Sequence, residues 1–385
     1  MARIIGGVGT THVPSIGNAI AKGLQRDPYW APFFGGFGAA HGWLARERPD
    51  VVVVFYNDHG LNFFLDKIPT FAVGAASGLD ALRLALTAAG VEPGHEVVVP
   101  AMTFIATLEA VTQAGARPVI ADVSESDYCL DVDAAASAVT ARTRCLLPVH
   151  LYGQMADCVA LQSLAVRSGL ILLEDACQAH GASRDGHGAG TVGLAAAFSF
   201  YPSKNLGAFG DAGAVLTDDD RLAATVRGLR EHGQYVKYRH AQEGWTARLD
   251  TVQAVVLLRR LPLLERWNEE RRRAVSYYID ALGEVGDLRL PPLPAGSKPA
   301  WHLFVVRTAD PEELGRSLRT RRIGTGRHYP EPPHLSPAYA WLGHRPGQFP
   351  VAERLASECL SLPLFPGISE AQLEAVVDAV RAYFE

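Results

Sequence analysis

Long apolar runs are missing from the 385-residue sequence, and none approaches the roughly 20 residues that a membrane-spanning helix requires. Residues 1–7 lack the apolar core of a signal peptide. The five cysteines are odd in number and have no metal-ligand spacing, which argues against a disulfide framework. These absences favour a cytoplasmic protein with no membrane partner.

The sequence also lacks a strong charge of either sign. A net charge of -5 gives no reason to expect nucleic acid or an anionic membrane as a partner. No internal repeat and no low-complexity tract is present. With 48% hydrophobic and 20% charged residues, the composition is that of an ordinary globular enzyme, and the length favours about two domains.

What the sequence does contain is a regular alternation of helical and extended patterns from residue 78 onward. Helical patterns cover residues 81–89, 104–114 and 161–168, and extended patterns cover residues 96–99, 118–121, 145–149 and 170–173. Two earlier apolar runs, residues 2–5 and 51–56, also have the pattern of buried strands. The alternation predicts an α/β fold with a mostly parallel sheet and crossover helices.

The regular alternation of helical and extended patterns ends at about residue 262. A polar, arginine-rich helix is expected over residues 263–282, followed by a linker rich in proline and glycine at 290–296. A strand is expected at 301–307 and a closing helix at 370–383, with Ser369 as its N-cap. This order predicts a smaller C-terminal α+β domain.

Asp175 and Lys204 form the pair of residues that carries the chemistry. Asp175 ends an apolar strand, and ligands of parallel sheets bind beyond the carboxyl ends of the strands. There it can pair with the pyridinium nitrogen of pyridoxal 5'-phosphate. Lys204, in the run 199–207, can attach to the cofactor's aldehyde and then move a proton as a free amine. Its apolar neighbours should depress its pKa.

Candidate phosphate contacts come from the start of the helix near residue 80 and from a serine before the lysine. Ser77, Gly78 and Leu79 begin the helix, and Asp80 follows Ser77 by three residues. A glycine at a helix N-terminus admits phosphate against bare amides. Taken alone this pattern is a capping box. Ser199 could donate a second contact.

Two further residues are weaker candidates for cofactor contacts. Phe104 follows a strand and could stack on the pyridine ring, although a lone aromatic residue is more often part of a core. Gln178 lies three residues beyond Asp175 and could reach the phenolic oxygen of the cofactor. His180 could hold Asp175 in place without contacting the cofactor itself.

From about residue 72 to 385 the sequence resembles the DegT/DnrJ/StrS family of pyridoxal-phosphate sugar aminotransferases. The matching motifs are residues 72–82, 148–154, 174–180, 199–207 and 328–330. The resemblance implies a fold-type I enzyme that works as a homodimer. It also implies glutamate as amino donor, a nucleotide-linked keto-sugar as acceptor, and the roles given above to Asp175, Gln178, Ser199 and Lys204.

One motif departs from the family pattern. Where the family has an asparagine two residues before an arginine, reaching the partner subunit's phosphate, this chain has the shorter Thr246. Arg248 and His328 could bind substrate, with a structural salt bridge and a packed histidine as the alternatives.

Residues 1–74 resemble a different family, the catalytic β subunit of protocatechuate 4,5-dioxygenase. The matching segments are residues 10–14, 27–30 and 55–62. In that family the histidines matching His12 and His59 bind Fe(II), but an iron site also needs a carboxylate, and the family's later segments are missing here. We therefore expect no metal, and we expect this segment to replace the aminotransferase family's usual N-terminal region.

The expected domains are residues 1–74, a dioxygenase-like α/β fragment; 75–262, the cofactor-binding domain; and 263–385, the small domain. The leading hypothesis is a sugar aminotransferase. An Fe(II) ring-cleavage dioxygenase and a fusion that binds the cofactor without turnover are the alternatives.

Overall fold

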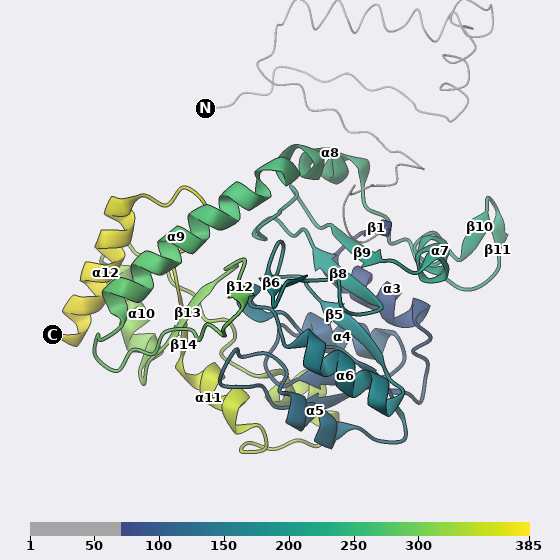
Figure 1. The fold of residues 1–385 in the computed structure, drawn as a ribbon, viewed down its shortest axis with the longest axis horizontal. Coiled ribbons are helices and arrows are strands. Elements are labelled where there is room, and N and C mark those ends of the chain that lie inside the picture. Colours follow the sequence, from purple (N-terminus) through teal and green to yellow (C-terminus); the bar gives the residue numbers. More distant parts are fainter. Residues whose placement is uncertain (1–70) are drawn as a thin grey trace, which may run out of the picture. The chain divides into compact units, whose positions relative to one another are not determined.

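The computed structural model describes residues 71–385, and Figure 1 shows their arrangement. A seven-stranded sheet has the order β1-β9-β8-β5-β4-β2-β3. Its strands are β1 (Phe71–Ala75), β2 (Glu96–Pro100), β3 (Arg117–Ala121), β4 (Thr143–Leu146), β5 (Ile171–Asp175), β8 (Ala195–Ser199) and β9 (Gly213–Thr217). From β8 to β3 all neighbours are parallel, whereas β9 is antiparallel to both β1 and β8. The expected mostly parallel sheet is confirmed.

Helices connect these strands and continue beyond them. They are α3 (Gly78–Ala88), α4 (Ala106–Gln113), α5 (Val132–Ala138), α6 (Cys158–Ser168), α7 (Asp220–Leu229), α8 (Thr251–Arg260), α9 (Leu264–Leu282), α10 (Pro311–Thr320), α11 (Pro350–Glu358) and α12 (Glu370–Phe384). The sequence pattern located α6 three residues late, because Asp157 caps it by accepting the Ala160 N–H at 3.0 Å. Within residues 71–385 no helix combines the length and apolarity needed to cross a bilayer.

Short strands and 3₁₀ turns complete the described chain. They are β6 (Ser183–Arg184), β7 (His187–Gly188), β10 (Gln234–Val236), β11 (Arg239–His240) and β12 (Ser297–Lys298), with turns at Leu151–Gly153, Leu261–Leu263, Pro333–Leu335 and Pro337–Leu342. The first turn matters for the site, since a Cβ on Gly153 (φ +91°) would lie 2.7 Å from the His302 amide nitrogen. Only glycine allows this close approach of two backbones.

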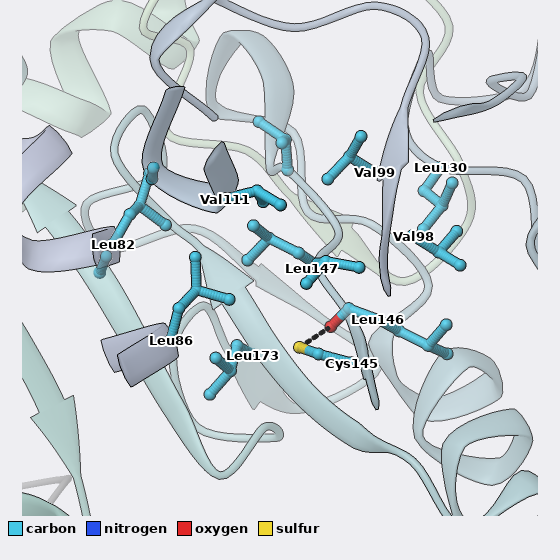
Figure 2. Close-up of a cluster of buried hydrophobic side chains, with 14 of the residues drawn as sticks. Leu82, Leu86, Val98, Val99, Val111, Leu130, Cys145, Leu146, Leu147 and Leu173 are labelled. Atoms are coloured by element: carbon cyan, nitrogen blue, oxygen red, sulfur yellow. Dashed lines mark hydrogen bonds between the residues drawn. The ribbon is translucent and has the colours of Figure 1, made fainter. Parts of the chain in front are cut away.

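The main core fills the space between the sheet and its helices. All five residues of β2 are buried, which is typical of a parallel sheet covered on both faces. Figure 2 shows how Leu82 and Leu86 of α3 lie against this interior together with Leu147 and Leu173. The strands whose carboxyl ends carry the site are therefore held by a densely packed apolar core.

A second apolar cluster joins α9, α10 and α12 to β13 (Phe304–Arg307) and β14 (Cys359–Leu362). Tyr278 stacks on Phe304 with ring centroids 5.1 Å apart. The strand expected from residue 301 begins only at Phe304, because Trp301 has a left-handed φ of 47°. Ser369 caps α12 as expected, in a capping box with Gln372.

Several expectations fall on residues that the structure does not describe. The strands expected at 2–5 and 51–56 lie outside the described residues, as do His12 and His59. The domain boundaries at 74 and 262 remain predictions.

Candidate active site

The candidate site is built where β5, β8 and the start of α3 meet. β5 ends at Asp175 and its parallel neighbour β8 ends at Ser199, so their carboxyl ends share one edge of the sheet. A Cβ on Gly78 would lie 2.6 Å from the Ser199 Cβ and 3.2 Å from the Cys177 Sγ. The helix start, the end of β8 and the loop after β5 are therefore in direct contact, as the sequence motifs required.

Lys204 lies in the loop that follows β8. Its backbone N–H donates to the Tyr201 carbonyl at 2.8 Å, which closes a turn. Burial lowers the pKa of Lys204 below its usual 10.5, and interactions with Cys177 and Asp175 only partly oppose this. A lower pKa leaves more of the amine neutral and nucleophilic near neutral pH. The direction agrees with the sequence-based expectation.

Asp175 is buried, and both oxygens of its carboxylate are held. Oδ1 accepts the Cys177 backbone N–H at 3.2 Å, and Oδ2 accepts the Thr107 hydroxyl at 2.8 Å. Sequence reasoning missed Thr107, which is 68 residues away in the chain. His180, expected to support Asp175, makes no hydrogen bond to it and instead packs against Phe198 and Phe200.

Glu174, next to Asp175 on β5, is the centre of a separate buried network. Its Oε1 accepts the N–H groups of Val192 and Gly193, and its Oε2 accepts the Gly190 N–H and faces His150 Nε2 at 2.9 Å. Burial acts to raise the pKa of Glu174, but these donors outweigh it and the pKa is lowered. The network anchors the end of β5.

His150, Cys158 and Glu174 are also the one group within residues 71–385 whose ligand atoms lie close enough to hold a metal. Both oxygens of Glu174 already accept N–H donors, and His150 Nδ1 accepts the Ala156 N–H at 3.2 Å. Hydrogen bonds thus occupy the lone pairs that a metal would need. The cluster is a structural one.

The start of α3 is capped from within. Ser77 Oγ accepts the Asp80 N–H at 3.0 Å and donates its own proton to Asp80 Oδ2 at 2.8 Å. Ser77 is therefore the N-cap of α3, as expected, and its contact with the cofactor phosphate stays a prediction. Ser199 Oγ accepts the Tyr201 N–H at 3.3 Å, so its proton is still free to donate. The first amides of α3, at Gly78 and Leu79, have no acceptor inside the helix and can bind an anion together with Ser199.

Gln178 is held by two tyrosines that the sequence analysis did not single out. Its Oε1 accepts the Tyr152 N–H at 2.7 Å, and its Nε2 donates to the Tyr329 hydroxyl at 3.1 Å. Phe104 is 51% exposed, so it is not a core residue, and its ring centroid lies 5.5 Å from that of Tyr329. Contact of Gln178 with a cofactor oxygen remains a prediction. Burial raises the pKa of Tyr329 to about 12.

The two candidate substrate residues differ in their surroundings. His328 Nδ1 lies 2.7 Å from Ser361 Oγ, and the His328 carbonyl accepts the Tyr152 hydroxyl. Burial, followed by the charge of Lys204, lowers the pKa of His328, which places this imidazole near the amine in neutral form. Arg248 instead forms an ion pair with Glu231 at 3.3 Å.

Thr246, the position that departs from the family pattern, lies on the surface. Its Oγ1 is 3.0 Å from His232 Nε2. The threonine hydroxyl is therefore held by a neighbour in its own chain.

Pyridoxal phosphate requires an amine, an acid for its ring nitrogen, an aromatic face and donors for its phosphate. The described residues supply all four at one edge of the sheet. Within residues 71–385 the Lys204 Nζ makes no hydrogen bond or ion pair, and a half-buried amine without such a bond is available for covalent attachment. The residues present fit the cofactor.

Comparison with known families decides the assignment. The model of the DegT/DnrJ/EryC1/StrS aminotransferase family matches residues 64–381. The chain belongs to this family. A second model, of the catalytic LigB subunit of aromatic ring-opening dioxygenase, matches residues 6–93. Both resemblances expected from the sequence are confirmed.

Curated members of the aminotransferase family are closely similar. The chain is 48% identical over 314 residues to the dTDP-3-amino-3,4,6-trideoxy-alpha-D-glucose transaminase of Streptomyces venezuelae, covering 82% of this chain and 83% of that one. It is 43% identical over 310 residues to the UDP-N-acetyl-3-dehydro-alpha-D-glucosamine 3-aminotransferase of Acidithiobacillus ferrooxidans, covering 80% and 83%.

Solved structures show the same fold. DesV of S. venezuelae, in complex with a ketimine intermediate, matches with a TM-score of 0.81 and 47% identity, covering 83% of this chain and 86% of that one. NtdA of Bacillus subtilis, with bound cofactor PMP, matches with a TM-score of 0.76 and 31% identity, covering 82% and 73%. The expected fold-type I architecture of residues 71–385 is confirmed.

Proposed function

We propose that this chain transfers an amino group from glutamate to a nucleotide-linked keto-sugar, with pyridoxal phosphate as cofactor. One observation carries the proposal: the half-buried Lys204 amine faces the charge of the buried Asp175 at the carboxyl edge of the sheet. Relatives that act on dTDP-linked and UDP-linked sugars support the acceptor class. Glutamate is the donor that the family resemblance implies.

Each residue of the site has a defined task. Bound pyridoxal phosphate supplies the electron sink that makes the donor's α-proton acidic. Asp175 pairs with the ring nitrogen, and the start of α3 with Ser199 binds the phosphate. Lys204 would hold the cofactor between turnovers and, as a free amine, would move a proton on and off the donor's α-carbon. Phe104 offers its exposed face to the ring.

We further propose that two copies of the chain associate near this site. The loop of Lys204 carries Tyr201 and Phe209, which are 53% and 71% exposed, and α8 adds Val255 and Leu258 at 52% and 55%. The Phe209 N–H donates to Gln253 of α8 at 2.8 Å, so the loop and the helix are neighbours, and large apolar side chains exposed on neighbouring elements are typical of an interface. Burying them against a second copy would also shield Lys204 from water.

The central experiment measures cofactor attachment and turnover in the purified full-length chain. We expect visible absorbance on addition of pyridoxal phosphate, loss of that absorbance on borohydride reduction, and a reduced cofactor mapped to the peptide that contains Lys204. Glutamate and a dTDP-linked or UDP-linked 3-keto-sugar should then release 2-oxoglutarate. Glutamine and aspartate serve as competing donors.

The control variant for Lys204 replaces another of the few lysines in the chain. The chain has five, and of those described, Lys298 is half exposed in an ion pair with Glu265. Lys204→Ala should abolish both absorbance and turnover, whereas Lys298→Ala should leave both unchanged. Absorbance without 2-oxoglutarate release from any donor and sugar would reduce the chain to a cofactor-binding protein, and absence of absorbance would contradict the assignment altogether.

The second copy is tested separately by sedimentation. Val255→Asp with Leu258→Asp should convert a dimer into a monomer. Val166→Asp on α6, where valine is 68% exposed on another helix, is the matched control and should leave the dimer intact. A native chain that sediments as a monomer at tens of micromolar would refute the proposed association.

A further inference from the structure

Two threonine side chains form a hydrogen-bonded chain in the interior that ends at Asp175. Thr107 Oγ1 lies 2.8 Å from Asp175 Oδ2, and Thr103 Oγ1 lies 2.8 Å from Thr107 Oγ1. Thr103 and Thr107 are each 1% exposed, and Asp175 is 4% exposed. These contacts are shielded from bulk solvent, and they join the first turn of α4 to the end of β5.

The direction of each bond follows from the donor inventory. A carboxylate only accepts, so the single proton of Thr107 must go to Asp175. The Thr107 oxygen then accepts from Thr103. Thr103 has one alternative acceptor, the Phe104 carbonyl at 3.3 Å. Aligned hydroxyls polarise one another, which strengthens the final bond to the carboxylate.

We propose that Thr107 is a positioning residue that fixes the plane of the Asp175 carboxylate for the cofactor's ring nitrogen; this rests on the function proposed above. The Cys177 N–H holds Oδ1 at 3.2 Å, and Thr107 holds Oδ2. With both oxygens held, the carboxylate is oriented before the cofactor arrives. Preorganised groups lose little entropy on binding, so the contribution should appear in cofactor affinity.

The test compares isosteric variants on one helix. Thr107→Val removes the hydroxyl at nearly constant volume and leaves Thr103 the Phe104 carbonyl as acceptor, so the fold should persist. We expect the dissociation constant for pyridoxal phosphate, measured by titrating the apoprotein, to rise about tenfold or more. Thr107→Ser should restore it to within about twofold. Thr112 lies on the same helix and has no contact with Asp175, so Thr112→Val should leave this dissociation constant unchanged.

A second probe separates positioning from general damage. The 1-deaza analogue of pyridoxal phosphate has no ring nitrogen for Asp175, so Thr107→Val should change its dissociation constant less than twofold. In an Asp175→Ala background, which leaves no group for Thr107 to orient, the Thr107→Val effect on pyridoxal phosphate should likewise disappear. Equal weakening for cofactor and analogue, or no weakening in Thr107→Val, would overturn the role of Thr107 alone. A native chain that binds no pyridoxal phosphate would overturn the proposed function and this role together.

Discussion

At the scale of a single residue, Lys204 lowers the stability of the fold while it supplies the amine that the chemistry needs. Its partial burial lowers the pKa, and the nearby Cys177 and Asp175 offset this effect only in part. Functional sites commonly hold such unfavourable groups. We expect Lys204→Met, which keeps the length and removes the charge, to raise the unfolding free energy of the apoprotein at pH 7 by about 1 kcal/mol. Denaturant unfolding with intact cooperativity measures this.

The same variant has a defined pH dependence. The folded pKa of Lys204 is below the 10.5 of the unfolded chain, so between these values the unfolded state binds more protons and native stability rises with pH. The advantage of Lys204→Met should therefore shrink as the pH is raised toward 10.5. Lys237→Met, at an exposed position that forms no ion pair with a described residue, serves as the control for removal of a lysine charge. An advantage that grows with pH would contradict the buried-amine interpretation.

At the scale of elements, the sequence predicted the positions of strands and helix starts, which depend on local patterns. The alternation of apolar runs located β2 and β5 to within a residue or two, and the Ser77 cap located the start of α3. Contacts distant in sequence were not predictable in this way. Thr107 reaches Asp175 across 68 residues and Gln178 reaches Tyr329 across 151, and no spacing rule connects such positions. Only the folded sheet brings them together.

The loop between β7 and β8 depends on one side chain for its shape. Glu174 accepts three N–H groups from residues 190–193. Glu174→Gln would replace one carboxylate oxygen by an NH2 group, which would face at least one N–H donor that Glu174 now accepts. We expect a loss of about 3 kcal/mol of unfolding free energy at pH 7, measured by denaturant unfolding.

Glu243→Gln is the matched control for Glu174→Gln, because Glu243 is exposed and its amide should cost nothing measurable. The folded pKa of Glu174 is lowered, so its contribution is present above the unfolded value of 4.5 and is lost as the pH falls through the folded pKa. The gap between native and Glu174→Gln proteins should accordingly close in acid. A gap that is independent of pH would mean that shape, and not charge, holds the loop.

At the scale of the whole described chain, two cores share the same strands. On β13, Val305 packs into the main core, while Phe304 and Val306 pack into the C-terminal cluster. On β14, Cys359 and Leu360 divide in the same way. Because side chains alternate across a strand, this hairpin lies between the cores and is needed by both. The C-terminal cluster is therefore packed against the main core through this hairpin, whereas a domain joined only by a linker would share no core strands.

This shared hairpin predicts that residues 71–385 unfold as one unit. Hydrogen exchange of the full-length chain, followed by mass spectrometry across a denaturant series, should give one midpoint for peptides from α3 and from α12, although α12 makes no contribution to the cofactor site. Pyridoxal phosphate at 100 times its dissociation constant should stabilise both by about 2.7 kcal/mol. Val305→Ala should lower both midpoints equally. If α12 exchanged at lower denaturant than α3 and did not respond to the cofactor, the chain would instead contain an independent small domain, and the hairpin would couple the two cores too weakly to matter.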